Sequence, residues 1–215
     1  IVTRDNELKD TLQKLGTKPR LVITDSQVFS KVKKIVPEDV ELTSFSILMA
    51  RYKGVLDYAV LVISGTDGIQ NHTLTLWQLL RNYRIPIFLF INKMDREGKD
   101  PFDLLDEVES ELQIKVRPLS WPINQGARFK GVYNIYEQNL NLFTPNKQMV
   151  TEKVNVDINS SELDERVGEQ DAEKLREDLE MIDGVYETFD VNKYLDAEIA
   201  PVFFGSALNN FGVQE

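Results

Sequence analysis

Four consecutive residues, Asn92-Lys93-Met94-Asp95, combine polar groups that suit one kind of nucleobase. The Asp95 carboxylate can accept hydrogen bonds from two adjacent N–H donors, such as N1 and N2 of guanine. The Asn92 amide can accept and donate on the opposite edge of the base, and the Lys93 stem can lie over the ring plane. Adenine lacks that pair of neighbouring donors, so the sequence predicts a guanine site.

The elements that must position these residues are two buried strands. The apolar run 87–91 immediately precedes Asn92, and ligand crevices in open α/β sheets lie at the carboxyl ends of such strands. A second strand is predicted at 202–204, and Gly205 follows it. Ser206 and Ala207, in the turn that follows this strand, are small enough to let a base approach and can offer it a backbone N–H. We therefore expect one guanine-binding site that contains Asn92, Lys93, Asp95, Ser206 and Ala207.

The stretch 55–120 alternates predicted strands and helices. Its apolar patterning predicts strands at 59–64, 87–91 and 114–119 and helices at 71–82 and 101–112, with a turn at 65–68. This alternation is typical of the α/β class, with a mostly parallel sheet and helices on both faces.

More than 100 residues separate the two strands of the predicted site, far more than a loop between neighbouring strands needs. We therefore predict that residues 55–120 and 200–215 form one domain and that residues 121–199 form an inserted α+β subdomain. The insertion should contain a β-hairpin, with strands at 132–136 and 140–143, and an acidic helix at 161–182 that ends at Gly184.

We predict that residues 1–54 form a separate small α/β segment. Its pattern predicts a helix at 6–15, a strand at 21–24, a helix that Asp25-Ser26 begins and Pro37 stops, and a helix at 44–52.

Composition excludes several classes of function. The 215 residues include no cysteine, which excludes disulfides, thiolate metal sites and cysteine catalysis. The net charge of −10 argues against broad binding of nucleic acid by the surface of this protein. The sequence has no apolar run that could cross a bilayer and no secretory segment, so we expect a cytoplasmic protein. We predict no metal-binding residues in this sequence.

The residues that would hold the phosphates of a nucleotide are missing from the sequence. A phosphate loop has the pattern Gly-x-x-x-x-Gly-Lys-Ser/Thr, and its Ser/Thr holds Mg²⁺. Gly16-Thr17-Lys18 lacks the earlier glycine and is followed by Pro19. We expect weak binding of GTP or GDP and no hydrolysis of GTP. In phosphoryl transfer, positioning of the phosphates supplies nearly all of the catalysis. No catalytic residue is predicted.

From about Asp100 to Glu215, the sequence resembles the GTPase domain of bacterial peptide chain release factor 3. The resemblance rests on the runs 100–109, 121–123, 128–133 and 200–213. It implies a translational GTPase that removes class-1 release factors from the ribosome after termination, with Mg²⁺ required only in an intact family member. It also implies that Asn92, Lys93 and Asp95 read the base and ribose, and that Ser206 and Ala207 close over the guanine.

Two further resemblances concern the rest of the chain. Residues 55–95 are similar to tetracycline-resistance ribosomal protection proteins, which are sister translational GTPases. The runs 21–29, 42–48 and 50–54 resemble the carboxyl-terminal region of the [FeFe]-hydrogenase maturation GTPase, without the cysteines that hold its iron–sulfur cluster. We hypothesise a chimera, in which a maturase-like segment joins a translational GTPase near Gly54.

The origin of the chain and its function each leave two alternatives open. The chain is either such a chimera or a genuine, divergent protein. Its function is either that of a guanine-nucleotide-binding module or that of a non-catalytic interaction or scaffold segment related to hydrogenase maturation.

Overall fold

The computed structural model of the chain describes residues 21–24, 41–44, 58–143, 152–209 and 211–212. The chain forms two compact units, Ile1–Leu56 and Asp57–Glu215. In the first unit, β1 (Leu21–Thr24) and β2 (Glu41–Ser44) form a parallel pair, which confirms the strand predicted at 21–24. Strand β2 occupies Ser44, where the sequence predicts the start of a helix. The rest of that helix, and the other two helices predicted in residues 1–54, lie outside the described residues.

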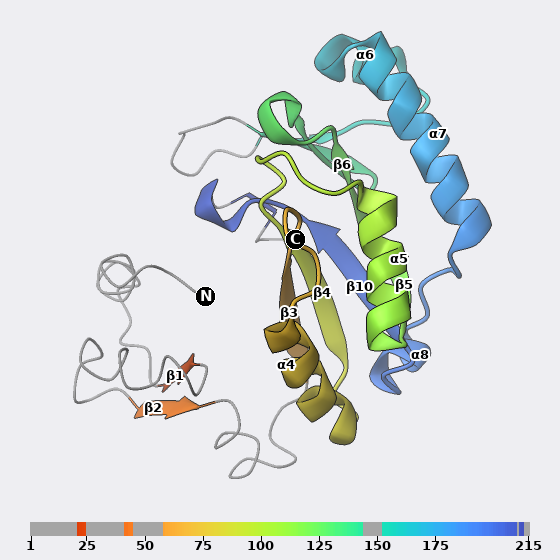
Figure 1. Cartoon of the computed structure of the whole chain (residues 1–215). Coiled ribbons are helices and arrows are strands. Elements are labelled where there is room, and N and C mark those ends of the chain that lie inside the picture. The colour runs from red at the N-terminus through yellow and green to blue at the C-terminus, as the bar shows by residue number, and fades with distance from the viewer. Residues whose placement is uncertain (1–20, 25–40, 45–57, 144–151, 210, 213–215) are drawn as a thin grey trace. The chain divides into compact units, whose positions relative to one another are not determined.

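The unit Asp57–Glu215 is built on a four-stranded parallel sheet with the order β3-β4-β10-β5 (Figure 1). Phe204 pairs with Ile91, so β10 and β4 end side by side although they are far apart in the sequence. This arrangement confirms the predicted α/β class with a parallel sheet. The strands of this sheet are β3 (Ala59–Ser64), β4 (Ile87–Asn92), β5 (Lys115–Pro118) and β10 (Ile199–Phe204).

One face of this sheet is covered by α4 (Asn71–Asn82) and α5 (Pro101–Leu112), which have the predicted bounds (Figure 1). Burial of this face supplies most of the driving force for the core, because apolar area removed from water is the dominant favourable contribution to folding. The strand side chains on this face are almost fully buried, and they are Leu61, Ile63, Leu89, Ile91, Val202 and Phe204.

Helix α5 keeps its predicted bounds because both of its ends carry strong local signals. The Asp100 carboxylate accepts a hydrogen bond from the Phe102 N–H at 2.8 Å, and Pro101 begins the first turn. Gln113 ends the helix in the left-handed region, with φ 52°.

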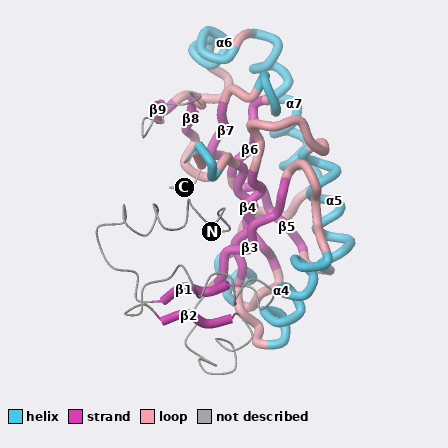
Figure 2. Tube along the Cα trace, turned by 60° about the vertical axis from the view of Figure 1, so that its left-hand side comes forward, coloured by secondary structure: helices cyan, strands magenta, loops and turns pink. Residues whose placement is uncertain are grey.

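A second, antiparallel sheet follows, with the order β6-β7-β8-β9 (Figure 2). Its strands are β6 (Ser120–Ile123), β7 (Gly131–Asn134), β8 (Asn139–Leu142) and β9 (Glu152–Asn155). The pairing of β7 with β8 confirms the predicted hairpin. Strand β6 contains Pro122, which reads as a turn signal in the sequence. The proline is accommodated because β6 is at the edge of its sheet, where one row of N–H groups has no strand to bond.

The acidic helix predicted at 161–182 is two helices, α6 (Ser161–Val167) and α7 (Glu169–Val185), so the prediction is wrong in two respects. Gly168 separates them with a φ of 89°, which favours glycine. Gly184 does not end the second helix. A Cβ at Gly184 would meet nothing within 4 Å, and a glycine inside an exposed helix costs only about 1 kcal/mol, so the helix continues to Val185.

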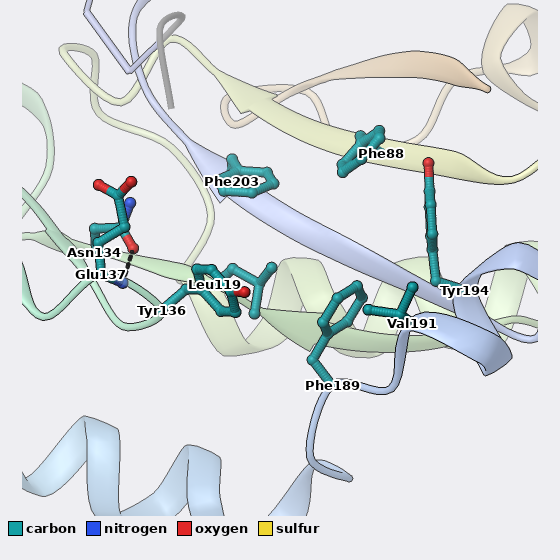
Figure 3. A pocket seen from close by; sticks show the side chains of 9 residues that line it. All are labelled: Phe88, Leu119, Asn134, Tyr136, Glu137, Phe189, Val191, Tyr194 and Phe203. Carbon is teal, nitrogen blue, oxygen red and sulfur yellow. Dashed lines mark hydrogen bonds between the residues drawn. The ribbon is translucent and has the colours of Figure 1, made fainter. Parts of the chain in front are cut away.

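The opposite face of the parallel sheet carries aromatic side chains and the short helix α8 (Val191–Leu195). The ring of Tyr194 on α8 lies 4.9 Å from that of Phe88, so helices cover part of both faces. On β3, Val60 and Val62 remain more than half exposed. A pocket of about 340 Å³ opens on this face, where Figure 3 shows Phe88, Phe203, Leu119, Tyr136, Phe189, Val191 and Tyr194 around it, with Asn134 and Glu137 at one end.

Candidate guanine-binding site

The structure brings the predicted site residues together at the carboxyl ends of β4 and β10. Asn92 is the last residue of β4, and Ser206 and Ala207 follow β10. Hydrogen bonds to backbone N–H groups join the two strand ends: Gly205 N–H donates to the Ile91 carbonyl at 2.9 Å, Met94 N–H donates to the Gly205 carbonyl at 3.1 Å, and Ala207 N–H donates to Asn92 Oδ1 at 2.8 Å. The two turns therefore form one connected surface.

The Asn92 side chain is held in a single orientation. Its Oδ1 accepts from the Lys93 N–H and from the Ala207 N–H, each at 2.8 Å. Both partners are donors and require an acceptor, so the amide oxygen faces them and Nδ2 is left as a donor. The expectation that the Asn92 amide both accepts from and donates to a base is therefore reduced to donation. The Nδ2 donor suits a base acceptor such as guanine N7.

The turn after β10 uses its N–H groups internally, which differs from the expectation that it offers one to a base. Ala207 N–H donates to Asn92, and Ser206 N–H donates to the Phe211 carbonyl at 3.0 Å. Ser206 is fully buried. These two residues therefore support the shape of the site and the orientation of Asn92 in this structure.

Lys93 has a positive φ of 72°, and its ammonium pairs with a residue that the sequence analysis missed. The Lys93 Nζ lies 3.1 Å from Asp67 Oδ2. Ser64 Oγ donates to the same oxygen at 2.6 Å, and Thr66 Oγ1 donates to it at 2.9 Å. The only sequence signal for Asp67 is its place just after β3, whose last residue Ser64 lies beside Asn92 in the sheet.

Hydrogen bonds from Ser64, then Lys93 and Thr66, lower the pKa of Asp67 to about 2. Because this folded-state pKa is below its usual 3.8, the group favours the folded state above pH 3.8, and that contribution is lost as the pH falls through 2. We expect the Asp67 carboxyl carbon to titrate near pH 2 by NMR. Ser64→Ala removes the largest cause and should move this midpoint upwards. A midpoint of 3.8 in the unmodified chain would contradict these contacts.

Asp95 is linked to the second turn through Asn209, another residue that the sequence analysis missed. Asn209 ends the short helix η2 (Ala207–Asn209), and its Nδ2 lies 3.3 Å from Asp95 Oδ2 and 2.9 Å from Ser206 Oγ. Met94, between Lys93 and Asp95, is buried and anchors their loop. The structure thus positions Asp95 with contacts from both turns.

Gly205 is required by close packing under the site. A Cβ at this position would lie 2.4 Å from the Phe211 carbonyl oxygen and 2.8 Å from Phe90 Cζ. The first of these neighbours is backbone, which cannot rotate away. The absence of a side chain at Gly205 therefore lets the turn after β10 fold back on Phe211 and pack against Phe90 of β4.

We expect Gly205→Ala to lower the free energy of unfolding by about 1–3 kcal/mol, the usual cost of overpacking. Urea denaturation measures the change. Gly184→Ala is the matched control, since its added Cβ meets nothing within 4 Å, and it should raise stability by roughly 0.5–1 kcal/mol. Equal stabilities of the two variants would show that the turns are not tightly packed.

In the described part of the chain, no helix is long and apolar enough to cross a membrane. The same residues contain no group of three or more His, Cys, Asp or Glu side chains that could hold a metal ion. The sequence contains no phosphate-loop pattern to supply a Ser/Thr ligand for Mg²⁺. The Asn92 amide and the Asp95 carboxylate at the ends of β4 and β10 suit the polar edges of a base.

A parallel sheet with helices on both faces is an architecture that many nucleotide-binding α/β domains share. Residues 43–215, most of the chain, match the family model described as the elongation factor Tu GTP binding domain. The chain therefore belongs to that family, whose members generally use guanine nucleotide and Mg²⁺. Residues 1–54 match the model described as the hydrogen maturase F dimerization domain, and the two matches overlap at 43–54.

Proposed function

We propose that the unit Asp57–Glu215 binds guanine nucleotide through its base. The observation that carries the proposal is the hydrogen bond from Ala207 N–H to Asn92 Oδ1 between the ends of β4 and β10. It fixes the Asn92 amide with its donor outwards, and the Asp95 carboxylate supplies the complementary acceptor. The proposed guanine-binding site consists of Asn92, Lys93 and Asp95, with Ser206 and Ala207 forming its second turn and supporting its shape.

Titration with a fluorescent GDP analogue tests this proposal. We expect a Kd of about 1 mM or tighter, which corresponds to roughly −4 kcal/mol and is reasonable for base recognition without a phosphate loop. Unlabelled GDP should displace the probe and ADP should not, because adenine lacks the adjacent N1 and N2 donors. Absence of binding at every attainable concentration, or equal displacement by ADP, would refute the proposal.

We further propose that this unit is part of a translational GTPase like peptide chain release factor 3 and does not hydrolyse GTP alone. The resemblance of residues 100–215 and the family match support the first part, and the missing phosphate-loop pattern supports the second. In this role the partners are the ribosome and class-1 release factors, the cofactor is GTP or GDP with Mg²⁺ in an intact member, and the location is the cytoplasm. Phosphate release from GTP above the uncatalysed rate would contradict the second part.

For the domain organisation, we propose a segment at 1–54, a GTPase-like part at 55–120 and 200–215, and an insertion at 121–199. We also propose a chimera joined near Gly54, on the resemblance of the runs 21–29, 42–48 and 50–54 to a hydrogenase maturase. Sequencing contiguous genomic DNA through the codons for Tyr52 to Leu56 tests the junction. An unbroken reading frame in a clonal isolate would overturn the chimera.

A second candidate function is that of an interaction segment. It is favoured by the match of residues 1–54 to a dimerization domain of a hydrogenase maturase. Sedimentation equilibrium of the full chain tests it, with a dimer expected at micromolar concentration. A strictly monomeric chain would leave only the nucleotide-binding proposal.

A further inference from the structure

Asn209 connects the two turns of the proposed site by its side chain. Its Nδ2 lies 3.3 Å from Asp95 Oδ2 and 2.9 Å from Ser206 Oγ, so one amide nitrogen reaches both turns. More than 100 residues separate Asn209 from Asp95, so only the pairing of β4 with β10 brings them together.

Asn209 is itself held firmly. Its backbone N–H donates to the Ser206 carbonyl at 3.1 Å. Ser206 is fully buried and exchanges two backbone hydrogen bonds with Phe211, each at 3.0 Å. The amide that contacts Asp95 therefore projects from a fixed part of the turn.

Recognition of guanine by a carboxylate depends on the rotation of that carboxylate. Both oxygens must lie in the plane of the base to accept from N1–H and N2–H together. The last torsion of an Asp side chain is broad, so an unrestrained Asp95 would sample many planes. A donor fixed on Oδ2 limits this rotation, and the remaining lone pairs of the two oxygens stay available to accept from a base.

We propose that Asn209 is a positioning residue that sets guanine specificity by orienting the Asp95 carboxylate. This inference rests on the proposed function of the site. Asn209 makes no direct contact with the nucleotide in this proposal. Asn209 affects only the pair of hydrogen bonds from N1–H and N2–H to Asp95, which distinguishes guanine from bases with one donor at this edge.

Comparison of GDP with inosine diphosphate measures that contact, because hypoxanthine keeps N1–H and lacks the 2-amino group. For the unmodified full chain we expect GDP to bind on the order of tenfold more tightly than inosine diphosphate, as for one hydrogen bond to a charged group. Asn209→Ala should weaken GDP binding several-fold and inosine diphosphate binding less, so the ratio falls towards one. A merely structural role would weaken both ligands equally.

Two further variants keep the test independent of folding. Asn209→Asp has nearly the same shape but replaces the donor with a like charge beside Asp95, so it should reduce the ratio at least as much as alanine. Leu208→Ala alters an exposed side chain of the same turn, 71% exposed, and should leave the ratio unchanged. Urea midpoints close to that of the unmodified chain establish that each variant is folded.

The outcomes separate this inference from the proposed function. If the unmodified chain binds no GDP, both fail. If it prefers GDP over inosine diphosphate and both Asn209 variants retain the full ratio, the positioning role of Asn209 is overturned while the guanine site stands. A reduced ratio in both variants, with the Leu208 variant unchanged, supports the inference.

Discussion

Replacing Asp95 with alanine should reduce the affinity for GDP by roughly two orders of magnitude, since two hydrogen bonds to a charged group are lost together. Titration of the full chain with the fluorescent GDP analogue measures this loss. The structure predicts a selective effect, because Asp95 lies in the turn after β4, is only half-buried, and makes one long side-chain hydrogen bond, to Asn209 at 3.3 Å. The fold should therefore survive the change.

Asp106→Ala is the control for loss of one negative charge. Asp106 is exposed on α5 and belongs to none of the site contacts described above, so its removal should leave GDP affinity within about twofold, as for weakly coupled surface charges. If both variants lose affinity equally, net charge rather than base recognition governs binding.

Asp95→Asn provides a change of specificity. The amide presents one donor and one acceptor, which complements the carbonyl and N–H at the corresponding edge of xanthine. We expect this variant to prefer xanthosine diphosphate over GDP, the reverse of the unmodified chain. A variant that binds neither ligand better than Asp95→Ala would show that Asp95 does not contact the base edge.

The sequence was sufficient where local signals decide the structure. The bounds of α5 follow from Asp100, Pro101 and the spacing of apolar residues, and β4 follows from the apolar run 87–91 that precedes Asn92. These signals act over a few residues, so no knowledge of the rest of the chain is needed. The adjacency of Asn92 and Ala207 was also predictable, because parallel strands place their carboxyl ends at one edge of the sheet.

Features that depend on tertiary contacts escaped prediction. Pro122 is compatible with a strand only because β6 is an edge strand, and that position is a property of the sheet. Asp67 and Asn209 reach Lys93 and Asp95 across 26 and 114 residues. Their roles depend on where their side chains lie in the folded protein, and the polarity of a residue in the sequence does not predict that position.

The second large effect is expected at Trp121, which joins four elements. Its ring, 1% exposed, lies 4.6 Å from Phe102 on α5 and 5.3 Å from Phe204 on β10. Its Nε1 donates to Asp178 Oδ2 on α7 at 2.9 Å. Trp121→Ala should lower the free energy of unfolding by about 3–5 kcal/mol, the usual cost of truncating a buried aromatic residue.

Urea denaturation measures this loss, and Tyr136→Ala is the control. Tyr136 is 73% exposed, and its truncation should change stability by no more than about 0.5 kcal/mol. A loss of similar size in both variants would mean that Trp121 does not join the antiparallel sheet to α5 and the parallel sheet.

Trp121→Phe separates packing from hydrogen bonding. Burial raises the pKa of Asp178, and the Trp121 N–H partly opposes this rise by donating to the carboxylate. Phenylalanine keeps an aromatic ring at this position and removes that donor, so the folded-state pKa of Asp178 should rise further. A carboxyl whose pKa is higher in the folded than in the unfolded state destabilises the fold once the pH exceeds its usual 3.8. The stability difference between Trp121→Phe and the unmodified chain should therefore be small at pH 3 and grow towards neutral pH. A difference independent of pH would assign the whole effect of Trp121 to packing.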